Sequence, residues 1–468
     1  MGTVQFHMTR TSRPAPRAWL LSAALACLSV LAATAPAAWA DTRPTPYGIA
    51  TRVAPQAFLN MPQTLDGQLP ARLSQTGAFD DLATLTPTPG LIPYDLIVPF
   101  WSDGAAKQRF MAIPKGGKIR FSATGDWVFP AGTVFVKTFL FATDAAHPDR
   151  LRRLETRLLV IGKDGPYGVT YKWRPDNSDA DLLPTEGQQE QISLHDANGA
   201  HSQTWGYPSR KDCLTCHNTH TSGVLGLKTR QLNRDLAYPS GVTDNELRTL
   251  NHLGLLEPAL RETDLPTLPR LAAMDDAARS LEDRARSYLD ANCGHCHRPG
   301  GTVAYFDARY ETPLDQQQFI DGPILINQGI DKPHPIAPHD IWRSIIYMRA
   351  DTNGDIRMPP IARATIDTRG MALLKSWIES LPGRDVLAPP AIAPEGGNFN
   401  GPVEVTLSSP DPGAQIHYTL DGSVPGPSDP VYDKPLRLEN PTVVRARAYQ
   451  DGHTRSIVAE QPFIIGGN

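Results

Sequence analysis

Two short motifs constrain this chain of 468 residues more than any other feature. Each has the pattern Cys-x-x-Cys-His, at residues 213–217 and 293–297. This pattern is the signature of covalent c-type haem attachment. The chemistry explains the spacing, because two thiols must reach two fixed vinyl groups on one macrocycle while the adjacent histidine ligates the iron beneath it. Two such motifs in one chain point to redox chemistry.

The motifs predict two covalently bound c-type haems as cofactors. We expect attachment through Cys213, Cys216, Cys293 and Cys296, and proximal iron ligation by His217 and His297. A zinc ribbon would place its cysteine pairs about 15–20 residues apart, far closer than these two pairs. A thioredoxin-like redox pair needs no histidine after it and usually opens a helix in a βαβ unit.

The fifth cysteine, Cys27, lies in a segment that we expect to be removed. A basic stretch with three arginines precedes an apolar run over residues 18–33, and Ala-Trp-Ala at residues 38–40 fits a signal-peptidase site. The run is short for a membrane span, so we expect no integral membrane span. Lipid attachment at Cys27 stays open. Export predicts a periplasmic protein, which agrees with haem attachment outside the bacterial cytoplasm.

Composition limits which kinds of partner can be expected and how many domains the chain forms. The formal net charge of −4 leaves no basic surface for nucleic acid. The 44 prolines and 37 glycines predict many turns and linkers, and the length predicts several domains.

The distribution of residue types along the chain predicts a multidomain α+β protein. Residues 127–139, 154–161 and 169–173 are rich in β-branched and aromatic residues, which favours strands. The expected segments are a signal peptide at 1–40, a loop-rich segment at 41–90, a β-rich domain at 91–200, a first haem-binding segment at 201–262, an all-α cytochrome c domain at 275–382 and a C-terminal β-sandwich at 392–468.

Residues 275–382 resemble a class I cytochrome c fold. Apolar residues at helical spacing run directly into the second motif, and a second amphipathic pattern follows at residues 371–381. Between them lies Met358, followed by two prolines. The resemblance implies that Met358 is the distal iron ligand, where a thioether opposite an imidazole raises the reduction potential. Met348 is expected to be an ordinary core residue.

The first motif has no comparable Met-Pro-Pro loop, so its sixth ligand stays open. The region around residues 129–137 resembles β-sheet cytochromes of the cytochrome c-prime-beta type, in which the distal face of the haem can be vacant, and it draws attention to Lys137. The other possible ligands are His195, His201, His220, His252, Met61 and Met111.

Residues 70–382 together resemble a group of exported bacterial dihaem c-type cytochromes. The matching segments are 91–94, 100–107, 127–137, 154–157, 208–213 and 231–233. The tail, around residues 416–448, resembles the small β-sandwich at the C-terminus of chitobiases. That resemblance implies a spacer or docking module, with carbohydrate binding as the alternative.

The expected function is periplasmic electron transfer between redox partner proteins, with no catalytic side chain. Two alternatives stay open. One is a peroxidase-like dihaem enzyme with an open first haem. The other is an electron-accepting subunit of a partner dehydrogenase.

Overall fold

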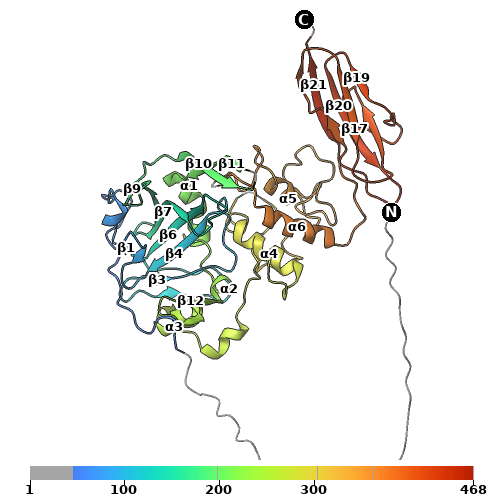
Figure 1. The fold of residues 1–468 in the computed structure, drawn as a ribbon. Helices are drawn as coiled ribbons and strands as arrows, with labels where there is room; N and C mark the ends of the chain where they lie inside the picture. Colours follow the sequence, from blue (N-terminus) through green and yellow to red (C-terminus); the bar gives the residue numbers. More distant parts are fainter. Residues whose placement is uncertain (1–45, 198, 303, 362, 467–468) are drawn as a thin grey trace, which may run out of the picture. The chain divides into compact units, whose positions relative to one another are not determined.

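The computed structural model describes residues 46–466, apart from residues 198, 303 and 362 (Figure 1). The predicted signal peptide and Cys27 lie outside the described residues. Within the described part, no helix is both long and apolar enough to cross a membrane.

A six-stranded antiparallel sheet forms the β-rich region. Alternation along its third strand sends Val134 and Val136 to one face and Phe135 and Lys137 to the other, as the period of a strand requires. In spatial order the strands are β3 (Ile92–Pro93), β4 (Ala106–Ala112), β6 (Val134–Ala142), β7 (Leu151–Ile161), β8 (Pro166–Trp173) and β9 (Ala180–Leu182). The strand expected from residue 127 begins only at Val134, because Pro130 and Gly132 (φ 88°) form a turn before it.

Shorter elements lie around this sheet. The strand pairs are β1 (Phe79–Asp81) with β2 (Thr86–Pro87), β5 (Ile119–Arg120) with β14 (Leu256–Glu257), β10 (Gln188–Asp196) with β11 (Gly199–Tyr207), and β12 (Asp235–Ala237) with β13 (Thr243–Asn245). The helices are α1 (Arg210–Cys216), α2 (Thr229–Leu232) and α3 (Glu246–His252), with 3₁₀ turns at Leu73–Gln75, Thr219–Thr221 and Glu262–Thr267. Leu232 and Leu247 of α2 and α3 share one buried core with Phe135 of the sheet, so these helices pack on the face that carries Lys137.

The prediction of an all-α cytochrome c domain at residues 275–382, and with it the multidomain α+β fold class, is wrong. The structure is mostly β, with 29% strand and 15% helix. Among the described residues of 275–382, the helices are α4 (Leu281–Asn292), α5 (Ile345–Ala350) and α6 (Thr368–Ser380). The described residues between 293 and 344 form turns, bends and irregular chain.

The predicted helices α4 and α6 are present, but most of the chain between them is not helical. Tyr288 of α4 and Trp377 of α6 lie in one core, as their apolar spacing predicts. The intervening chain satisfies its backbone through turns, through contacts between distant backbone segments and through side chains. For example, Arg286 donates to the carbonyl oxygens of Tyr310 and Thr312 at 3.0 and 2.8 Å.

The predicted C-terminal β-sandwich is confirmed. One sheet has the order β15 (Ala391–Ala393), β17 (Val403–Ser408) and β19 (Leu436–Leu438), and the other β16 (Gly397–Phe399), β21 (Ala459–Ile465), β20 (Thr442–Tyr449) and β18 (Gln415–Thr419). Both sheets contribute to one buried core, which includes Val405, Val444 and Phe463. Inward-facing residues alternate with exposed ones along β17, as packing between two sheets requires.

Candidate functional site

The first Cys-x-x-Cys-His motif is carried by α1. The Ser209 hydroxyl accepts from the Asp212 amide and the Asp212 carboxylate accepts from the Ser209 amide, so a capping box starts this short helix. α1 packs on β8 at Gly168. A Cβ at Gly168 would lie 2.9 Å from the Cys213 sulfur, so the missing side chain makes room for this cysteine.

His217 is fixed in orientation just after α1. Its Nδ1 lies 2.9 Å from the Gly223 carbonyl oxygen. Donation to that carbonyl places the proton on Nδ1 and leaves Nε2 free to bind a metal, the arrangement expected of a ligating histidine. Burial lowers the pKa of His217 to about 3, so the imidazole is neutral at physiological pH.

Cys213, Cys216 and His217 line a cavity of about 220 Å³. The sheet also lines this cavity, and there Arg109, Lys137 and Arg157 lie side by side on β4, β6 and β7. Arg109 pairs with Asp95 at 2.5 Å and Arg157 with Glu155 at 2.5 Å.

Lys137 has a different environment from the two arginines. Its Nζ lies 5.3 Å from the centroid of the Phe139 ring. Burial, followed by the charge of Arg157, lowers the pKa of Lys137 to about 7. The sequence resemblance singled out Lys137 but missed Arg109, Arg157 and Gly168. The strands of the two arginines also carry other charged residues, so no local sequence signal marked Arg109 or Arg157.

None of the six other proposed sixth ligands lines this cavity. Met61 and Met111 are buried in separate cores of the sheet region. His252 stacks on Tyr47 with 3.6 Å between ring centroids. His195 and His201 lie on the β10–β11 hairpin, and His220 lies in the turn after the motif.

The second motif opens on a smaller cavity of about 80 Å³. Cys293, His297 and Met358 line it, so the structure brings together three of the four residues that the sequence proposed for the second haem, whereas Cys296 lines the first cavity. The rest of the lining is largely apolar and includes Leu289, Phe306, Phe319, Ile345 and Leu374.

The environment of His297 differs from that of His217. Its ring stacks on Phe306 with 4.5 Å between centroids. Its Nδ1 is buried and, within the described part of the chain, has no hydrogen-bond partner. Burial lowers the pKa of His297 to about 4, so this imidazole is also neutral.

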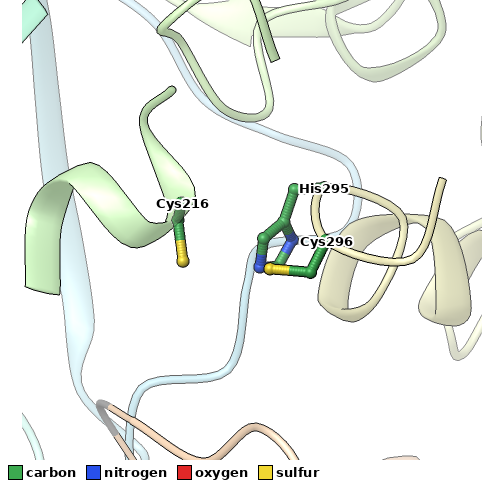
Figure 2. A group of neighbouring side chains, drawn as sticks. All are labelled: Cys216, His295 and Cys296. Carbon is green, nitrogen blue, oxygen red and sulfur yellow. The ribbon is translucent and has the colours of Figure 1, made fainter. Parts of the chain in front are cut away.

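The two motifs meet at a cluster of Cys216, His295 and Cys296, whose sulfur and nitrogen atoms all lie within 4.8 Å of one another (Figure 2). The structure places His295 in the lining of the first cavity. A hydrogen bond between the two thiols raises the pKa of Cys216 and lowers that of Cys296.

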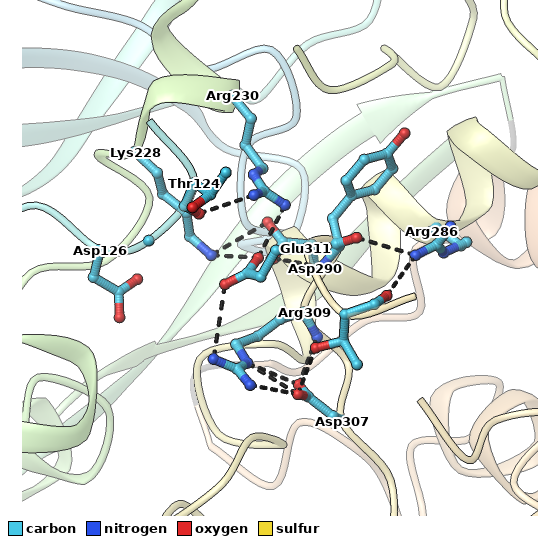
Figure 3. A network of polar contacts seen from close by, with 12 residues as sticks. Thr124, Asp126, Lys228, Arg230, Arg286, Asp290, Asp307, Arg309 and Glu311 are labelled. Atoms are coloured by element: carbon cyan, nitrogen blue, oxygen red, sulfur yellow. Dashed lines mark hydrogen bonds and ion pairs between the residues drawn. The ribbon is translucent and has the colours of Figure 1, made fainter. Parts of the chain in front are cut away.

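A buried ionic network joins the segments that carry the motifs (Figure 3). Lys228, which follows the first motif, pairs with Asp290 of α4 at 3.1 Å. Arg230 pairs with Glu311 at 2.9 Å, and its side chain is 1% exposed. Removing one partner of a buried ion pair leaves an uncompensated charge, so such pairs fix geometry strongly.

Comparison with known proteins identifies one region. Residues 394–460 match the family model of the chitobiase/beta-hexosaminidase C-terminal domain. This match agrees with the β-sandwich of the tail and covers neither motif. No curated protein and no solved structure matches the chain.

Proposed function

We propose that this chain is an exported dihaem c-type cytochrome that transfers electrons between periplasmic redox partner proteins. The observation that supports this most is the gathering of Cys293, His297 and Met358 around one apolar cavity. These residues would supply one attachment point, the proximal imidazole and the distal thioether. Met358 is remote from the motif in sequence, so the motif alone does not account for its position.

The residues of the first cavity also fit a c-type haem. His217 presents a free Nε2 because its Nδ1 donates to Gly223. Gly168 leaves space where Cys213 would carry a thioether. The sequence resemblance to exported dihaem cytochromes adds to this support, and attachment of this cofactor outside the cytoplasm agrees with the proposed location.

Haem supplies an iron that accepts and releases one electron. The protein contributes position and environment. The cysteines fix the macrocycle, and the hydrogen bond to Gly223 orients His217. Apolar side chains such as Phe319 and Leu374 exclude water from the second site, and the Met358 thioether favours the reduced metal.

A metal site at Cys216, His295 and Cys296 is the competing interpretation. Structural zinc takes four protein ligands, and this cluster offers three. It would also leave Cys213 and Cys293 without a role, although each belongs to a complete motif. Haem attachment uses all four cysteines and is therefore the stronger proposal.

A dihaem redox enzyme with an open first site is the second candidate. One observation favours it: among the described residues that line the first cavity, the histidines are His217 and His295, and no methionine is present. An electron-accepting subunit of a partner dehydrogenase is a third form of the same chemistry. In that case the C-terminal domain would dock the partner or a carbohydrate.

Optical and EPR spectra of the purified protein, with and without carbon monoxide, test the proposal. An electron carrier shows two low-spin irons that do not bind carbon monoxide. A high-spin iron that binds it contradicts the pure carrier and supports the enzyme. A protein without a haem spectrum contradicts both.

A further inference from the structure

The two cavities share a wall. Pro359, which follows the proposed ligand Met358, lines both cavities. Phe100 lines the first and its neighbour Trp101 lines the second. Adjacent residues of one segment therefore face different sites, which places the sites next to each other.

The second motif is itself divided between the cavities. Cys293 and His297 line the second cavity, whereas His295 and Cys296 line the first. Cys296 lies against Cys216 of the first motif, with His295 beside both sulfurs (Figure 2). The His295 ring also meets the edge of Phe100, at 5.3 Å between centroids.

One ion pair and a buried carboxylate support the segments that meet at this junction. Two residues after Cys296, Arg298 pairs with Asp126 at 2.6 Å, and both side chains are at most 14% exposed. On the other side, the Asp103 carboxylate accepts from the Ala364 and Thr365 amides at 2.9 Å. These polar contacts therefore stabilise the segments that bring the sulfur atoms of Cys216 and Cys296 together.

We propose that Cys216 and Cys296 hold the neighbouring edges of the two haems, with His295 as the positioning residue between them, so that the cofactors form one electronically coupled pair. This inference rests on the proposed haem attachment. The step that it serves breaks no bond and moves no proton. One electron leaves a ferrous iron, which becomes ferric, and reduces the other iron from ferric to ferrous.

EPR of the intact protein during a reductive titration tests the coupling. In the fully oxidised protein, each ferric haem relaxes quickly because a second paramagnetic iron is close. At half reduction, the haem that stays ferric should relax more slowly and give a sharper signal, since its neighbour has become diamagnetic. Identical relaxation at both stages overturns the inference.

Haem content is measured first on the same sample, by intact mass and by the pyridine haemochrome spectrum. Two haems with independent signals contradict the junction and leave the proposed function standing. One haem or none contradicts the proposed function itself.

Substitution of His295 tests its positioning role. His295→Ala should shift the midpoint potentials of both haems while the haem content stays at two. His295→Gln keeps a polar N–H group and should restore most of the shift. His147→Ala removes an exposed histidine, with 48% of its side chain accessible, and should leave both potentials unchanged. A shift confined to one haem, or equal shifts in His295→Ala and His147→Ala, overturns the assignment.

Discussion

Each cavity is lined by residues of a Cys-x-x-Cys-His motif, but the secondary structure around the two cavities differs. The second is lined by residues of α4, α5 and α6 and contains a methionine as well as its histidine. The first lies against a sheet and offers a row of basic side chains. The attachment chemistry is therefore local, whereas the chemistry available at the far side of each site depends on the surrounding fold.

The same difference decides which residues of each site could be predicted from the sequence and which could not. The motif residues are contiguous, so their spacing alone nominated them. Met358 was found because a Met-Pro-Pro sequence stands before an amphipathic helix. The row of Arg109, Lys137 and Arg157 comes from three strands and depends on their register. No local pattern contains that register.

The failed predictions have the same origin. The helical periodicity of residues 281–289 and 371–381 correctly placed α4 and α6, yet it says nothing about the chain between them. There, backbone hydrogen bonds of turns and side-chain donors such as Arg286 take the place of helical hydrogen bonds. The open choice among six sixth ligands came from composition alone, and none of those residues lines the cavity.

The largest effect is expected from removing one pair of cysteines. Cys213→Ala/Cys216→Ala should leave one haem per chain, held by the second motif. Cys293→Ala/Cys296→Ala should leave the other haem, with a different spectrum. Intact mass and the haemochrome spectrum of each variant measure the outcome. Indistinguishable spectra from the two variants would show that the two haem sites do not differ in ligands or environment.

Met358→Ala should open the second iron. Loss of the thioether makes that haem able to bind carbon monoxide and lowers its reduction potential. The matched control is Met348→Ala, since Met348 lies on α5 and does not line the second cavity. A carbon monoxide difference spectrum that is the same in the wild type and in both variants refutes Met358 as a ligand.

Gly168→Val should impair the first site alone. The added side chain would meet the Cys213 sulfur, because even a Cβ would lie 2.9 Å from it. We expect a reduced haem content, with the second haem retained. Gly401→Val is the matched control, since a Cβ there has no neighbour within 4 Å and Gly401 lines neither cavity. Equal haem content in both variants would show that Gly168 is not needed to seat the motif.

Lys228→Met tests whether the Lys228–Asp290 ion pair holds the segment after the first motif against α4. It leaves the fully buried Asp290 carboxylate without its ion pair, and breaking a buried pair costs about 3–5 kcal/mol. Lys375→Met removes an exposed pair with Glu379, which is worth at most about 1 kcal/mol. Denaturant unfolding should separate the two variants clearly. A similar loss in both would mean that the Lys228–Asp290 pair does not hold the regions together.

The central claim is that both motifs carry haem, and the haem count of the wild-type chain tests it most directly. We predict that the protein purified from a host that attaches c-type haem contains two covalently bound haems per chain, by intact mass and by haemochrome spectrum. A haem-free chain with a zinc ion bound through Cys216, His295 and Cys296 would contradict the account.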